Sequence, residues 1–185
     1  SPISKADCCL VTDGAAAIVL SATDRAWRDT AVPLLGAAAA TWHNRISAMP
    51  DLTVTAAAES GPRAMAMAGV IPADVDVVQL YDAFTINTLL FLEDLGFCAK
   101  GEGGAFVQGG GIAPGGRLAV NTNGGGLSCV HPGMYGIFAL IEAVRQLRGE
   151  AGARQLSQHR TAVVHGNGGT LSSQSTAVLG TAETL

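Results

Sequence analysis

The sequence predicts an α/β fold, in which helices pack against a β-sheet. Short apolar runs typical of buried strands alternate along the chain with segments whose apolar residues recur at helical spacing. Hydrophobic residues make up 48% of the chain and charged residues only 14%, so we expect a large buried fraction. Strands that alternate with helices indicate a sheet that carries helices on its faces.

The predicted elements follow one another along the whole chain, and no internal repeat or linker stands out, so residues 1–185 are interpreted as one domain. Apolar runs predict strands at residues 14–21, 33–42, 76–80, 118–121, 161–164 and 175–179. Helical spacing predicts helices at residues 59–69, 86–95 and 134–148, the last with the clearest amphipathic pattern. Residues 101–116 are rich in glycine and are expected to form an ordered loop or a mobile lid, and residues 165–169 are expected to connect the last two strands.

Charge and cysteine content exclude several classes of protein. A net charge of −4 with 11 Lys and Arg residues argues against a nucleic-acid surface or a basic membrane patch. The apolar runs are too short to span a membrane and no signal peptide is recognisable, so we expect a cytoplasmic protein. The cysteines, Cys8, Cys9, Cys98 and Cys129, form no C-x-x-C pair, which predicts reduced thiols and no metal site.

Three loops at predicted strand ends carry groups that can exchange protons. Tyr81 follows the third predicted strand, His131 and Tyr135 stand in a glycine-rich segment before the long helix, and His165 follows the fifth strand. Ligands bind outside the carboxyl ends of the strands in α/β sheets. The sequence therefore predicts a catalytic site at these loops. A packed strand-end tyrosine and a histidine that only fixes glycine backbone remain the structural alternatives for Tyr81 and His165.

Four motifs, at residues 13–17, 81–84, 121–131 and 165–169, together resemble the C-terminal half of the thiolase superfamily. The branch in question holds lipid-transfer proteins related to sterol carrier protein X thiolases and to bacterial steroid side-chain aldolases. Residues 121–131 match the Asn-x-Asn-Gly-Gly segment and its His-Pro loop, residues 81–84 stand where thiolases have Asn-Glu-Ala-Phe, and residues 165–169 stand at their Cys-x-Gly-Gly-Gly loop. Residues 13–17 resemble the start of the C-terminal domain's first strand. The resemblance implies a thiolase-like C-terminal domain with a five-stranded mixed sheet and helices on both faces, and a fragment that lacks the N-terminal half of its subunit.

The departures from the thiolase pattern point to the reaction. Thiolases take their second cysteine from one of two motifs, where this chain has His165 and Ala83. The resemblance to steroid side-chain aldolases of this branch implies a catalytic tyrosine pair, here Tyr81 and Tyr135. The resemblance therefore implies retro-aldol cleavage of a β-hydroxyacyl-CoA, with Tyr81, His131, Tyr135 and His165 as catalytic residues. The alternatives are an acetyl-CoA acetyltransferase or 3-ketoacyl-CoA thiolase, and a catalytically silent lipid- or acyl-CoA-binding subunit.

The resemblance also implies ligands and partners. Coenzyme A is expected as part of the substrate, with no tightly bound cofactor, and the setting is lipid or steroid metabolism. A homodimer and a small zinc-ribbon/OB-fold partner are further expectations. A tyrosinate base would require neighbours that lower the tyrosine pKa from about 10. The residues expected to contact the substrate are Asn123, Gly124, Gly125, Gly168 and Gly169.

Overall fold

The sheet in the computed structural model, which describes residues 2–25 and 31–184, has five strands in the order β1-β5-β4-β2-β3. Strand β2 runs parallel to its neighbours β4 and β3, whereas β5 runs antiparallel to both β4 and β1. The predicted mixed sheet is therefore confirmed. The strand bounds are β1 (Leu34–Thr41), β2 (Val77–Leu80), β3 (Ala119–Val120), β4 (Thr161–Gly168) and β5 (Ser173–Gly180).

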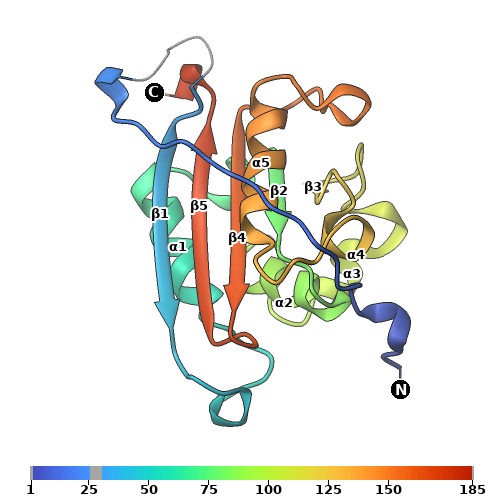
Figure 1. The fold of residues 1–185 in the computed structure, drawn as a ribbon. Helices are drawn as coiled ribbons and strands as arrows, with labels where there is room; N and C mark the ends of the chain where they lie inside the picture. Colours follow the sequence, from blue (N-terminus) through green and yellow to red (C-terminus); the bar gives the residue numbers. More distant parts are fainter. Residues whose placement is uncertain (1, 26–30, 185) are drawn as a thin grey trace.

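Helices cover both faces of the sheet, as predicted. Figure 1 shows α5 in front of the sheet, against β4 and β2, and α1 behind it, against β1 and β5. The amphipathic pattern of residues 134–148 accordingly yields one long helix that lies along the sheet. The helix bounds are α1 (Ala57–Ala68), α2 (Thr85–Asp94), α3 (Gly103–Val107), α4 (Gly125–Ser128) and α5 (Gly136–Leu147).

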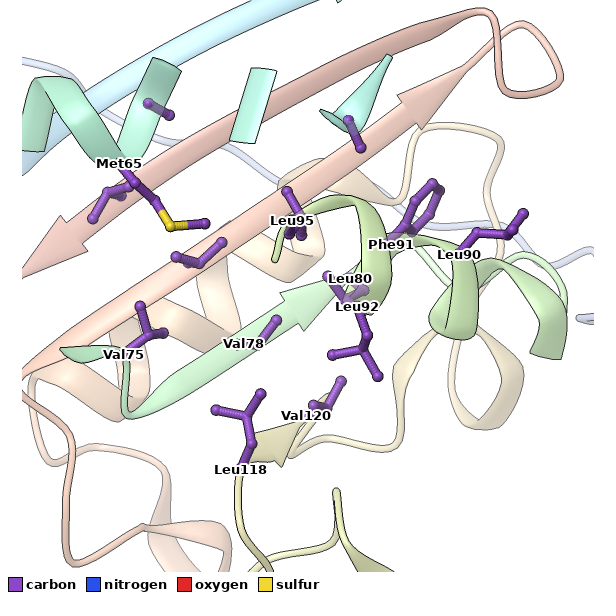
Figure 2. Packing of buried hydrophobic residues seen from close by; sticks show 14 residues of the cluster. Met65, Val75, Val78, Leu80, Leu90, Phe91, Leu92, Leu95, Leu118 and Val120 are labelled. Atoms are coloured by element: carbon purple, nitrogen blue, oxygen red, sulfur yellow. The ribbon is translucent and has the colours of Figure 1, made fainter. Parts of the chain in front are cut away.

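Strand β2 is buried on both faces and separates two hydrophobic clusters. Val78 and Leu80 point to one face, where Figure 2 shows them beside side chains of α2, among them Leu92. Val77 points to the other face, where Ala139 of α5 packs against it. Because successive side chains of a strand alternate between faces, the residue after Leu80 faces α5.

Two predicted elements are corrected by the structure. Residues 14–21 form no strand, and Val19 and Leu20 are 93% and 81% exposed. A strand needs a hydrogen-bonded neighbour, and the apolar pattern of this segment does not reveal whether such a neighbour exists. The expected loop at residues 165–169 is also wrong over most of its length, because β4 continues to Gly168, which pairs with Ser173 of β5.

The glycine-rich segment at residues 101–116 also differs from the expectation, because it contains the short helix α3. The amide of Gly103 donates to Glu93 Oε1 at 2.9 Å, which satisfies one of the free donors at the start of this helix. Phe106 packs against the core and carries the Arg117 guanidinium 5.0 Å above its ring centroid. These side-chain contacts outweigh the low helix propensity of glycine.

Two kinds of feature are not found in the described part of the chain. None of its helices is long and apolar enough to cross a membrane. Its histidine, cysteine and carboxylate side chains form no group of three that could hold a metal ion.

Close packing of α1 against β1 depends on Gly36. A methyl group at this position would overlap the carbonyl oxygen of Ala64 and lie 2.9 Å from the amide nitrogen of Ala68. We expect Gly36→Ala to lower the free energy of unfolding by about 1–3 kcal/mol, because the helix backbone cannot move away without opening the core. Urea unfolding of the purified variant measures this change.

Gly104→Ala is the matched control, because a methyl group there would have no atom within 4 Å. The exchange in the helix α3 should be neutral or stabilise the protein by up to ~1 kcal/mol. An equal loss of stability in both variants would contradict the tight packing of α1 on Gly36.

Candidate active site

The carboxyl ends of three parallel strands meet at one edge of the sheet. Leu80 at the end of β2 pairs with His165 of β4. On the other side of β2, the amide of Asn121 donates to the carbonyl oxygen of Val78 at 2.9 Å, directly after β3 ends. The loops that follow β2 and β3 therefore start side by side, which is where α/β sheets collect ligand-binding groups.

Asn121 ends the pairing of β2 with β3 and adopts an unusual backbone conformation. Its φ is +50°, which is uncommon for residues other than glycine. Its Oδ1 accepts the amide hydrogen of Leu80 at 2.7 Å, so the side chain replaces the next backbone partner of the strand. This bond turns the chain after β3 toward the loop that follows β2.

Asp82 joins the loop after β2 to the glycine-rich turn. Its buried carboxylate accepts the amide hydrogen of Gly126 at 2.6 Å. Gly125 lies against the same carboxylate, and a methyl group at Gly125 would overlap Asp82 Oδ2. Burial raises the pKa of Asp82, although hydrogen bonds from Gly126, Leu127 and Asn121 act in the opposite direction.

Tyr81, His131 and Tyr135 form one cluster on the α5 side of the sheet. The Tyr81 hydroxyl lies 3.2 Å from His131 Nδ1, and the two ring centroids are 5.6 Å apart. The Tyr135 ring centroid is also 5.6 Å from that of Tyr81. The Tyr135 hydroxyl donates a long hydrogen bond of 3.4 Å to Asn123 Oδ1. Three of the four predicted catalytic side chains are thus neighbours, and Tyr81 and His131 lie within hydrogen-bond distance of each other, so they can exchange a proton.

Both tyrosines stay protonated near neutral pH. Burial raises the pKa of Tyr81, and the neighbouring Cys9 and Asp82 raise it further. Burial also raises the pKa of the fully enclosed Tyr135 hydroxyl well above its usual range. The neighbours therefore do not lower the tyrosine pKa values, and a standing tyrosinate base is disfavoured.

His165 lies on the opposite face of the sheet from this cluster. It belongs to β4, is fully buried, and its ring centroid is 4.6 Å from that of Phe91. Its Nε2 is 2.8 Å from Gln174 Oε1 and its Nδ1 is 2.9 Å from Thr176 Oγ1. Gln174 in turn donates to the carbonyl oxygen of Leu171 at 3.0 Å, so the histidine supports the β4–β5 turn.

A cavity of about 570 Å³ borders the cluster. Tyr81 lines it together with the apolar side chains of Pro132 and Phe138, and Gly168 and Ser175 line its other side. Of the remaining residues expected to contact substrate, Gly169 is exposed in the β4–β5 turn and Gly124 is exposed at the start of α4. Gly125 is buried against Asp82, and this close packing leaves no room for a side chain at position 125.

The sequence motifs contain Asp82 and Asn121, but they predict no site role for these residues or for Thr12. Asp82 follows Tyr81 directly, but its partner Gly126 is 44 residues away. Thr12 contacts His131 across 119 residues of sequence. Asn121 carries the one local signal, because asparagine tolerates a positive φ at a strand end.

Comparisons with known proteins agree with this geometry. Residues 38–181 match the family described as thiolase C-terminal domain-like. The chain is 39% identical over 173 residues to an acetyl-CoA acetyltransferase of Methanothermobacter thermautotrophicus, covering 91% of this chain and 45% of that protein. It is 38% identical over 160 residues to a 17-hydroxy-3-oxo-4-pregnene-20-carboxyl-CoA lyase of Mycobacterium tuberculosis, covering 80% of this chain and 40% of that protein.

A solved structure extends the similarity to three dimensions. An Ltp2-ChsH2(DUF35) aldolase superposes with a TM-score of 0.72 at 31% sequence identity, over 81% of this chain and 39% of that chain. The chain therefore spans less than half the length of each of these relatives.

The buried His165 makes stability depend on pH. Burial lowers the pKa of His165 to about 4, whereas an unfolded histidine titrates near pH 6.5. Because the folded pKa is the lower one, this stabilisation is fully present above about pH 6.5 and is lost as the pH falls toward 4. We expect the free energy of unfolding to fall by about 2 kcal/mol from pH 7 to pH 5 through this group.

Urea unfolding at both pH values measures this fall. His165→Gln keeps hydrogen-bonding capacity without a titrating ring, so its stability should depend less on pH over this interval, whatever its absolute stability. The same loss between pH 7 and pH 5 in both proteins would contradict a neutral buried His165.

Proposed function

The chain belongs to the thiolase superfamily as a thiolase C-terminal domain, and on this premise we propose that it is the C-terminal half of a subunit that cleaves a β-hydroxyacyl-CoA by a retro-aldol reaction. The observation that carries the proposal is the contact of the Tyr81 hydroxyl with His131 Nδ1 at 3.2 Å. The two thiolase positions for a second catalytic cysteine hold Ala83 and His165. Proton transfer between phenol and imidazole therefore takes the place of thiol chemistry.

The first step removes the proton of the substrate's β-hydroxyl. Tyr81 accepts this proton on its phenol oxygen as its own proton passes to His131 Nδ1. The raised pKa of Tyr81 favours this coupled transfer over a free tyrosinate. The Cα–Cβ bond breaks, the β-carbon becomes a carbonyl group, and the electron pair moves into the thioester enolate.

The second step protonates the enolate and releases a shortened acyl-CoA. Tyr135 is the proposed donor, because its raised pKa keeps its hydroxyl protonated and Asn123 orients it. The proton taken up by His131 returns through Tyr81 to Tyr135, whose ring lies beside that of Tyr81. Neither a covalent acyl-enzyme nor free coenzyme A takes part, so coenzyme A enters only as part of the substrate.

The proposal also covers the substrate contacts, the partner proteins, the role of His165 and the cellular location. The cavity beside Tyr81, which Gly168 lines, is proposed to receive the acyl part of the substrate. Gly169 in the adjoining turn is proposed to contact the same part, and the turn at Asn123, Gly124 and Gly125 is proposed to lie near the thioester. The similar solved aldolase is named with a DUF35 protein, which supports a small zinc-ribbon/OB-fold partner beside a homodimer of the full subunit. His165 is proposed to position the β4–β5 turn, and the enzyme is proposed to act in the cytoplasm.

A thiolase reaction is the second candidate, because one similar protein is an acetyl-CoA acetyltransferase. The thiols of Cys9 and Cys129 lie close to the cluster, where they help to raise the pKa values of Tyr81 and Tyr135 respectively. The amide of Cys9 donates to the carbonyl oxygen of Ala83 at 3.1 Å, and Cys129 Sγ donates to that of Gly125 at 3.0 Å. A catalytically silent binding subunit would bind acyl-CoA esters without turnover.

Removal of single hydroxyl groups tests the tyrosine mechanism. In the full-length subunit, Tyr81→Phe and Tyr135→Phe should each lower turnover by ~10²–10⁴, because each removes one proton-transfer group. His131→Ala should lower turnover by ~10²–10³. The measurement is the rate of shortened acyl-CoA release from a panel of β-hydroxyacyl-CoA esters, with ester binding and unfolding followed as controls.

Cysteine alkylation distinguishes the retro-aldol reaction from the thiolase reaction. Turnover should survive modification of Cys9 and of the exposed Cys129, since neither thiol has a role in the retro-aldol steps. Near-normal rates in both phenylalanine variants, together with complete loss on alkylation, would favour the thiolase reaction.

A further inference from the structure

One N-terminal segment, residues 7–14, crosses both loops of the candidate site, and we call it the strap. Figure 1 shows this segment in blue in front of α5. At one end, Thr85 Oγ1 donates to Asp7 Oδ1 at 2.8 Å, and the amide of Cys9 donates to the carbonyl oxygen of Ala83 at 3.1 Å. The strap is thereby fixed to the loop that carries Tyr81.

The other end of the strap holds the loop that carries His131. The amide of His131 donates to Thr12 Oγ1 at 2.8 Å, and the amide of Thr12 donates back to the carbonyl oxygen of His131 at 3.3 Å. These two bonds close a ring between the two residues. They fix the backbone of His131 on both sides of its Cα atom.

The His131 loop has few other attachments. Among the described residues, every hydrogen bond made by residues 130–134 goes to Thr12 or to Tyr81. Gly133 has a φ of +81°, and Met134 is 79% exposed. Val130 packs against the hydrophobic cluster on the α5 side, but the hydrogen bonds that hold the backbone of His131 come from the strap.

We propose that Thr12 is a positioning residue that holds His131 Nδ1 within hydrogen-bond distance of the Tyr81 hydroxyl. This inference rests on the proposed function, because it assigns Thr12 to the proton transfer from Tyr81 to His131. Thr12 itself touches neither the substrate nor Tyr81. Its effect on the reaction passes through the backbone of His131.

The test compares three variants of the full-length subunit. Thr12→Val keeps the shape of the side chain and removes its acceptor oxygen, whereas Thr12→Ser keeps the oxygen. Thr85→Val is the matched control, since it removes a hydroxyl at the other end of the strap, where the bond from the Cys9 amide to the carbonyl oxygen of Ala83 keeps the strap attached. We expect Thr12→Val to lower kcat by about 3–10-fold with KM within about twofold, because one partly solvated hydrogen bond is lost. Thr12→Ser and Thr85→Val should keep the parent values.

Crystal structures of the same variants test the positioning whichever reaction the subunit catalyses. In Thr12→Val, the distance between the Tyr81 hydroxyl and His131 Nδ1 should lengthen from 3.2 Å, whereas Thr85→Val keeps the parent distance. An unchanged distance in Thr12→Val, or an equal loss of kcat in Thr12→Val and Thr12→Ser, would overturn the inference. A lengthened distance in a subunit without retro-aldol turnover would keep the positioning role of Thr12 and reject the proposed function.

Discussion

The site depends on one buried carboxylate. Asp82 follows Tyr81, the first residue after β2, and it accepts the amide hydrogen of Gly126 from the turn that follows β3. The tight approach of Gly125 to the same carboxylate explains why the turn is built of glycine. Since a buried carboxylate without donors is costly, the turn and the β2 loop stabilise each other. The glycine turn is followed directly by the segment that carries His131 and Tyr135.

Charge and burial decide which proton transfers this site supports. The apolar surroundings and the neighbouring Asp82 both disfavour a second negative charge, so Tyr81 and Tyr135 remain phenols. A phenol in contact with an imidazole can still accept a proton, provided that it passes its own proton on in the same step. His131 Nδ1 lies where such a transfer requires. The arrangement therefore favours a coupled transfer of two protons, one onto Tyr81 and one from Tyr81 to His131, in a site where Tyr81 and Tyr135 both remain protonated.

Periodicity predicted the elements that are buried against the sheet. The predicted helix at residues 134–148 contains α5 and the predicted strand at residues 76–80 contains β2, since their apolar spacing is set by the faces they bury. The role of His165 could not be predicted from periodicity. Side chains of a strand alternate between the two faces of the sheet, so an error of one residue in the predicted end of β4 places His165 on the wrong face. The partners of Asp82 and Thr12 are 44 and 119 residues away, and no local pattern contains such contacts. The predicted grouping of Tyr81, His131 and Tyr135 came from the family resemblance and from the rule that ligands gather at strand ends.

The requirement for free coenzyme A tests the proposed reaction most directly. A retro-aldol enzyme splits a β-hydroxyacyl-CoA into a carbonyl compound and a shortened acyl-CoA, whereas thiolysis consumes one coenzyme A for each bond broken. The measurement follows both products of the full-length subunit with and without added coenzyme A. The tyrosine mechanism predicts equal amounts of the two products in the absence of free coenzyme A. Cleavage that starts only when coenzyme A is added, and then acts on a 3-oxoacyl-CoA, would contradict it.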